Sequence, residues 1–172
     1  MTQTSTHWTA TLACLGPVGH LPKAPGTWGS AVAIPAAVLS MILLSPLMMC
    51  LVTVGLVFFA VWCCGQAEKV LGAHDPGCVV LDEFAAVLCC YLGPILFFPH
   101  IAEMVRHADQ ILTPRALIIH VAVFALFRLF DIWKPWPVSV SQNLPKGWGV
   151  VMDDVLAAGY VNLILIAAIS LM

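Results

Sequence analysis

Long apolar stretches dominate this sequence, and short segments between them hold most of the polar residues. Five stretches stand out by hydropathy, at 30–44, 47–65, 79–98, 116–133 and 151–172. A transmembrane helix needs about 20 mainly apolar residues, within a range of roughly 17–25. Four stretches reach that length, whereas the first is short and is expected to be tilted, re-entrant or extended by its flanks. The pattern predicts an all-α integral membrane bundle of about five transmembrane or re-entrant helices.

The overall composition supports a membrane environment. Of the 172 residues, 61% are hydrophobic and only 9% are charged, and the mean hydropathy is +0.98. Soluble domains carry about 25% charged residues, so this chain could not cover its apolar surface in water. Neither an internal repeat nor a low-complexity linker divides the sequence, which favours one domain over 1–172. A basic stripe interleaved with aromatic residues is absent, which argues against a nucleic-acid partner.

The cysteines do not suggest a metal or disulfide framework. There are seven, an odd number, and none forms a C-x-x-C pair. Two adjacent pairs lie inside apolar stretches, where a free cysteine behaves as a small buried hydrophobic residue. We therefore expect the cysteines to be packing residues.

Alternate crossing of the five stretches predicts an orientation. The N-terminal segment and the loops 66–78 and 134–150 then share one side of the membrane, and the loop 99–114 lies on the other. The first side holds four lysines, whereas the second holds two arginines. Because positive residues favour cytoplasmic loops, we expect the first side and the N-terminus to be cytoplasmic. The lysines are Lys23, Lys69, Lys134 and Lys146, and the arginines are Arg106 and Arg115.

Charged residues are concentrated at the ends of these stretches. Seven of the sixteen Lys, Arg, Asp and Glu residues fall in three blocks, at 81–84, 128–134 and 149–154. In an alternating bundle, the starts of the third and fifth helices share a face with the end of the fourth, so the blocks should meet on the cytoplasmic side. Ionisable groups at the membrane are costly and usually functional. The blocks therefore predict one site.

The acids of these blocks have the chemistry of a magnesium site. The metal ligands we expect are Asp82, Glu83, Asp153 and Asp154. Carboxylates without clustered His or Cys favour Mg²⁺ over Zn²⁺. Neighbours on a helix point about 100° apart, so one acid of each pair is expected to coordinate directly, while the other holds a water, a second ion or a lysine. The alternative is that the acids only stabilise helix N-termini.

Two further segments offer groups that could bind phosphate. The sequence PKAPGTWGS at 22–30 precedes the first stretch and supplies Lys23, Thr27 and Ser30. Free N–H groups at a helix start attract phosphate, although a Pro/Gly turn that caps the helix explains the segment equally well. At the end of the fourth stretch, Arg128 and Lys134 could clamp a phosphate, or Arg128 could form a salt bridge with Asp131.

The turn HDPG at 74–77 contains His74, which can exchange a proton near neutral pH. The alternative role for this histidine is to cap the turn. We predict that His74, Asp82 and Asp131 act in catalysis.

Five motifs in order resemble the phosphatidylglycerophosphatase A family: PGTWGS at 25–30, HDPG at 74–77, VLDEF at 80–84, FRLFDIWKPWP at 127–137 and GWGVVMDDVLAAG at 147–159. The resemblance spans about residues 16–160. It implies a Mg²⁺-dependent phosphatase of the bacterial inner membrane that converts phosphatidylglycerophosphate to phosphatidylglycerol. Metal ions would polarise the phosphoryl oxygens and activate water. Direct attack by water and an aspartyl-phosphate intermediate both remain open.

Two other functions fit parts of the pattern. A lipid head-group phosphotransferase would carry a D-G-x-x-A-R…G-x-x-x-D-x-x-x-D pattern, which this sequence lacks. A cation transporter would need carboxylates near the middle of the membrane, whereas the acids here lie at the ends of apolar stretches.

Overall fold

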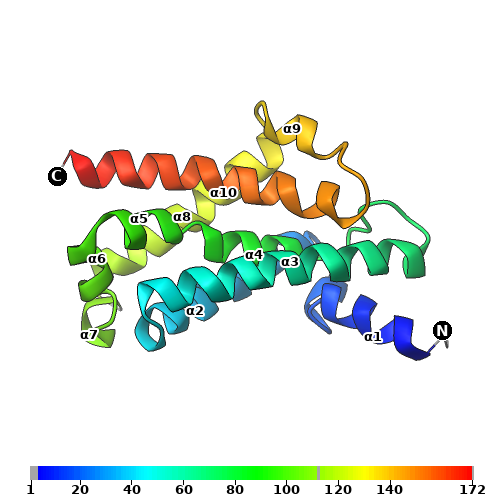
Figure 1. The fold of residues 1–172 in the computed structure, drawn as a ribbon, viewed down its shortest axis with the longest axis horizontal. Helices are drawn as coiled ribbons and strands as arrows, with labels where there is room; N and C mark the ends of the chain where they lie inside the picture. The colour runs from blue at the N-terminus through cyan, green and yellow to red at the C-terminus, as the bar shows by residue number, and fades with distance from the viewer. Residues whose placement is uncertain (1–3, 112, 172) are drawn as a thin grey trace.

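The described part of the chain is helical, as the apolar stretches predict. The computed structural model describes residues 4–111 and 113–171, and these residues contain no strand. Figure 1 shows the long helices side by side along one axis. In chain order the elements are α1 (Thr4–Ala13), the short 3-10 helix η1 (Val18–His20), α2 (Pro25–Leu43), α3 (Pro46–Leu71), α4 (Leu81–Cys89), α5 (Leu92–Phe97), α6 (Pro99–Met104), α7 (Ala108–Ile111), α8 (Pro114–Trp133), α9 (Val138–Ser141) and α10 (Gly147–Ser170).

Four helices, α2, α3, α8 and α10, are long and apolar enough to cross a membrane. The first apolar stretch reaches this length because α2 starts at Pro25, five residues before the stretch, and has 19 residues. Proline is well suited to a first helical position, where its missing N–H has no partner to lose. Of the three options for this stretch, extension by its flank is therefore the one observed.

The third apolar stretch is not one continuous helix. It divides into α4 and α5, which run in the same direction and are separated by Cys90 and Tyr91. The side chain of Asn162 in α10 bridges the break: its Oδ1 accepts a hydrogen bond from the Gly93 N–H at 2.7 Å, and its Nδ2 donates to the Cys89 carbonyl at 2.9 Å. Broken helices at membrane depth need such internal partners for their backbone groups. The sequence pattern could not reveal this partner, which comes from a distant helix.

Two other boundaries differ from the sequence prediction. Residues 66–71, expected in a loop, continue α3 by almost two turns, up to a cap at Gly72. Helix α10 starts at Gly147 rather than at 151. At Gly147 a Cβ atom would collide with the Val61 carbonyl oxygen of α3, so this glycine permits close packing of the two helices. Close contact between membrane helices usually depends on such small residues.

The direction of each helix positions the charged blocks. Helices α2, α4 and α10 start toward the end of the molecule where α3 finishes, and α8 runs back toward them from the opposite end (Figure 1). Although α4 and α5 replace a single helix, the chain still alternates in direction as the sequence predicts. The starts of α4 and α10 therefore lie near the end of α8.

The cysteines pack as small apolar residues. All seven are free thiols. Cys63, Cys64 and Cys90 are completely buried, and the first two lie in the core cluster that joins α1, α3, α4 and α10. This agrees with the expectation that they are packing residues.

Candidate active site

Three carboxylates from two helices converge at the predicted site. Asp82 and Glu83 lie in the first turn of α4, and Asp154 lies in the second turn of α10. One oxygen from each of the three lies within 4.8 Å of the others. Asp82 and Asp154 are only 5% and 3% exposed. Burying three like charges together is unfavourable unless a cation or proton compensates them.

The hydrogen bonding of these acids fits a cation. Asp82 Oδ1 and Glu83 Oε2 are buried and have no hydrogen-bond partner. Unsatisfied buried carboxylate oxygens are costly, and hard divalent cations take ligands of this type. The three residues therefore form an acidic cluster that could hold a metal ion.

Both members of the first acid pair belong to this cluster, whereas only one was expected to coordinate. The reason lies in the geometry of the first turn of α4. Glutamate is one methylene longer than aspartate, so Glu83 can reach the oxygens of Asp82 and Asp154 despite the angle between neighbouring positions.

The two acids of the second pair have different partners. Asp154 joins the cluster, whereas Asp153 binds the neighbouring loop. Lys134 Nζ donates to Asp153 Oδ2 at 2.6 Å, and Gln142 Nε2 donates to the same oxygen at 3.1 Å. Asp153 Oδ1 accepts from the Asp154 backbone N–H at 3.0 Å. Both oxygens of Asp153 are thus occupied, so its metal role stays a prediction without geometric support.

Lys134 is held as a cation at the edge of the site. It follows the last residue of α8, with a φ of 48°. Burial lowers its pKa, but the hydrogen bond to Asp153 and the charges of Asp153, Asp131 and Asp154 raise it more, and the net result is a raised pKa. The ammonium group therefore stays protonated at neutral pH beside the acidic cluster.

Arg128 is the second cation at the site, and it bridges α8 and α4. Its Nη1 lies 2.5 Å from Asp131 Oδ2 and 3.8 Å from Glu83 Oε1. The salt bridge with Asp131, one of the two alternatives for Arg128, is thus present. Arg128 Nε and Nη1 are buried and make no well-aligned hydrogen bond. Nη1 is paired with carboxylates, whereas the Nε–H remains available to an anionic ligand.

The start of α2 closes the site from a fourth helix. A Cβ atom at Gly26 would collide with Glu83 Oε1 and lie 3.4 Å from Arg128 Nη1. A larger residue at position 26 would displace the Glu83 carboxylate from its present position. The PGTWGS segment therefore contributes to the site through its backbone.

The structure gives less support to the other predicted phosphate ligands than to Arg128 and Lys134. Ser30 is fully buried, and its hydroxyl donates to the Gly26 carbonyl at 2.8 Å, so it is engaged within α2. Lys23 is exposed just before α2, and Thr27 is partly buried in its first turn. Their predicted roles stay predictions.

His74 lies in the turn after α3 and is paired with a residue that the sequence analysis did not select. Its Nδ1 lies 2.5 Å from Glu68 Oε1, which also accepts from the Asp75 N–H at 3.2 Å. The His74 side chain is 67% exposed. This arrangement resembles the alternative in which the histidine fastens the turn, and the catalytic role of His74 stays a prediction.

Sequence reasoning missed two polar residues that pair with predicted site residues, Gln142 and Glu68. Gln142 lies just after α9, and only the fold brings it to Asp153. Glu68 is six residues from His74, beyond the spacing of one helical turn. Neither residue lies in a motif that would have marked it.

Comparison with known proteins gives the relationships of the chain. It is 34% identical over 157 residues to the phosphatidylglycerophosphatase A of Haemophilus influenzae, covering 87% of this chain and 81% of the relative. It is 32% identical over 141 residues to the phosphatidylglycerophosphatase A of Escherichia coli, covering 81% and 70%. A Bacteroides thetaiotaomicron protein is 36% identical over 153 residues, covering 87% and 85%, and its name gives phosphatidylinositol-3-phosphatase as a provisional activity.

No solved structure matches this one. The family model described as Phosphatidylglycerophosphatase A matches residues 11–169, nearly the whole chain. The acids and cations described above lie within that match, and the chain belongs to the phosphatidylglycerophosphatase A family.

Proposed function

We propose that this protein hydrolyses the phosphomonoester of phosphatidylglycerophosphate and releases phosphatidylglycerol and phosphate. Membership of the family and the names of two relatives support this activity. The observation that carries the proposal is the joining of an acidic cluster with two cations, Arg128 and Lys134, at the ends of membrane helices. A metal-binding cluster with adjacent cations suits the negative charge of a phosphomonoester.

The proposed metal is Mg²⁺, held by Asp82, Glu83 and Asp154. The all-oxygen donor set and its two unpartnered oxygens support a hard divalent cation. When bound, Mg²⁺ polarises phosphoryl oxygens and lowers the pKa of a water.

The two cations are proposed to bind the phosphate from either side of the cluster. Arg128 offers a buried Nε–H that lacks a partner, and Asp131 holds its guanidinium in place through Nη1. Lys134 is oriented by Asp153, which in turn accepts from Gln142. Fixed cations stabilise the charge that develops during phosphoryl transfer without reorganising. Asp131 and Asp153 thus act as positioning residues for the cations in this proposal.

We place the site on the cytoplasmic side of the bacterial inner membrane. The helix directions support one face for the three charged blocks (Figure 1). Lys23, Lys69, Lys134 and Lys146 belong to segments of that face, and the positive-inside rule assigns them to the cytoplasm.

Phosphate release by purified protein in detergent tests the function. Phosphatidylglycerophosphate would be compared with phosphatidylinositol 3-phosphate, because one relative's name refers to that lipid. We expect Mg²⁺-dependent release from phosphatidylglycerophosphate at the higher kcat/KM. A higher value for the inositol lipid would reassign the substrate, and equal activity after EDTA treatment would remove the metal from the proposal.

A further inference from the structure

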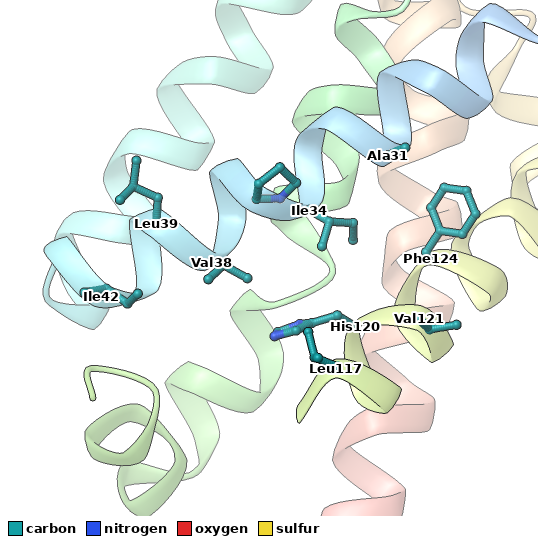
Figure 2. A pocket seen from close by; sticks show the side chains of 10 residues that line it. Ala31, Ile34, Val38, Leu39, Ile42, Leu117, His120, Val121 and Phe124 are labelled. Carbon is teal, nitrogen blue, oxygen red and sulfur yellow. The ribbon is translucent and has the colours of Figure 1, made fainter. Parts of the chain in front are cut away.

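An apolar groove lies between α2 and α8, outside the charged site. Its volume is about 830 Å³, which is within the range of ligand pockets. Figure 2 shows side chains of both helices facing across it. Ala31, Val38 and Ile42 line the α2 wall, and Leu117, Val121 and Phe124 line the α8 wall. Leu117 and Val121 are 50% and 66% exposed, so the groove opens on the face of two helices able to span a membrane.

The groove begins about one helical turn from the charged site, measured along α2 and α8. Ala31 lies one helical turn after Thr27 in α2, and Phe124 lies one turn before Arg128 in α8. Gly26 and Arg128, one turn farther along the two walls, are the residues that meet Glu83. The two walls therefore lead from the apolar groove to the acidic cluster and its cations.

The length of the groove matches one leaflet of a bilayer. The eleven-residue step from Ala31 to Ile42 covers about 16 Å along α2, at 1.5 Å per residue. The hydrocarbon core of a bilayer is about 30 Å thick, so one leaflet contributes about 15 Å. A chain that starts at the site would therefore lie in the groove over the depth of its own leaflet.

The chemistry of the walls suits a hydrocarbon. His120 is the titratable residue among those lining the groove, and both of its ring nitrogens are occupied. Nε2 lies 3.3 Å from the Ile111 carbonyl, and Nδ1 lies 3.0 Å from the Tyr91 hydroxyl. The carbonyl can only accept, so Nε2 carries a proton, and the tyrosine hydroxyl is the partner of Nδ1. Both polar atoms of the ring are therefore turned to protein partners.

We propose that this groove binds one acyl chain of the phosphomonoester lipid whose head group lies at the acidic cluster. The proposal rests on the proposed function and adds the subsite that positions the substrate. An acyl chain gains little free energy by leaving lipid for protein, because both surroundings are apolar. The groove would instead fix the direction of the lipid, so that its phosphate meets Arg128 and Lys134.

Filling the groove tests this role. In Val38→Trp the indole would occupy the groove near His120, across from Val38 in Figure 2. Val38 lies seven residues beyond Ala31 in α2, about 10 Å farther from the charged site. A six-carbon acyl chain that starts at the site would therefore end before it reaches Val38. The matched control is Val54→Trp, since Val54 is an exposed residue of α3 that does not line the groove.

The measurement is kcat/KM for phosphatidylglycerophosphate with two hexadecanoyl chains and with two hexanoyl chains, in the same detergent. We expect the ratio of the long-chain to the short-chain value to fall about tenfold in Val38→Trp, because misplaced substrates lose rate steeply. The ratio should stay at the wild-type value in Val54→Trp. An unchanged ratio in Val38→Trp, or an equal fall in both variants, would overturn the proposal.

Photolabelling tests the same groove in the unaltered protein and does not depend on turnover or on folding of a variant. The probe is phosphatidylglycerophosphate with a diazirine in one acyl chain, in EDTA, and the control is phosphatidylcholine with the same chain. We expect adducts at 31–42 and 117–124 to be in clear excess with the phosphomonoester lipid. Equal labelling by both lipids would overturn the acyl-chain site. A wild-type protein that hydrolyses neither chain length but shows the excess would contradict the proposed function and retain the groove.

Discussion

Replacing Asp154 with asparagine separates the metal role of the acidic cluster from its effect on folding. The substitution keeps the size of the side chain and removes one negative charge. The carboxylate of Asp154 lies within 4.8 Å of those of Asp82 and Glu83. Two unit charges at 4.8 Å repel by about 3.5 kcal/mol at an effective dielectric constant of about 20. Without a cation, the wild-type cluster must carry this repulsion or take up a proton.

Two opposite effects follow for Asp154→Asn. In EDTA its melting temperature should equal or exceed that of the wild type, because the repulsion is relieved. With Mg²⁺ the wild type should gain about 2.7 kcal/mol at a hundredfold excess over Kd. The variant loses one charged ligand, worth about 1.5–3 kcal/mol, or about tenfold to hundredfold in Mg²⁺ affinity. Its phosphate release should fall with its Mg²⁺ affinity.

Thermal unfolding in detergent, with EDTA or with a Mg²⁺ titration, measures both effects. Phosphate release is measured on the same samples. Asp109→Asn is the matched control, since Asp109 is an exposed acid in α7, at the opposite end of the molecule from the site (Figure 1). The reasoning is refuted if Asp154→Asn melts well below the wild type in EDTA and still gains the full Mg²⁺ stabilisation.

Four further outcomes are expected. Lys134→Ala should raise KM and lower kcat by about tenfold to hundredfold, whereas Arg128→Ala, which also loses contact with Glu83, should weaken the Mg²⁺ dependence more than lipid affinity. Independent titrations of Mg²⁺ and lipid check this, and wild-type behaviour of both variants would mean that neither residue belongs to the site. Gly26→Ala should reduce activity more than tenfold because its Cβ would displace the Glu83 carboxylate, and Gly55→Ala, with open space around it, is the control. Glu83→Gln should abolish activity in a protein that still inserts and folds, and near wild-type turnover at low Mg²⁺ would exclude Glu83 from the metal ligands. In a variant without native thiols, a new cysteine at 146 should react only from the cytoplasm and one at 109 from outside, and labelling of intact cells in the reverse pattern would reverse the orientation.

The hydropathy pattern and the positions of the charged residues were enough to predict the spanning helices and the meeting of the charged blocks. The long apolar stretches predicted the spanning helices, because a membrane segment must be long and apolar whatever it packs against. Alternating direction then predicted that the blocks containing Glu83, Arg128 and Asp154 would meet, and the structure brings them together. This inference needed only the order of the stretches and the end at which each block lies.

Only the tertiary structure decided the partners within that site. Asp153 and Asp154 are equivalent in sequence, and their roles differ because α10 turns one toward Lys134 and the other toward α4. The side chain that bonds the backbone at the break between α4 and α5 is Asn162, which is 69 residues from Gly93. The groove between α2 and α8 also arises from the packing of distant segments. Local sequence determines which stretches are apolar enough to span a membrane and where charge lies along them, whereas side-chain pairing depends on how the helices rotate and pack against one another.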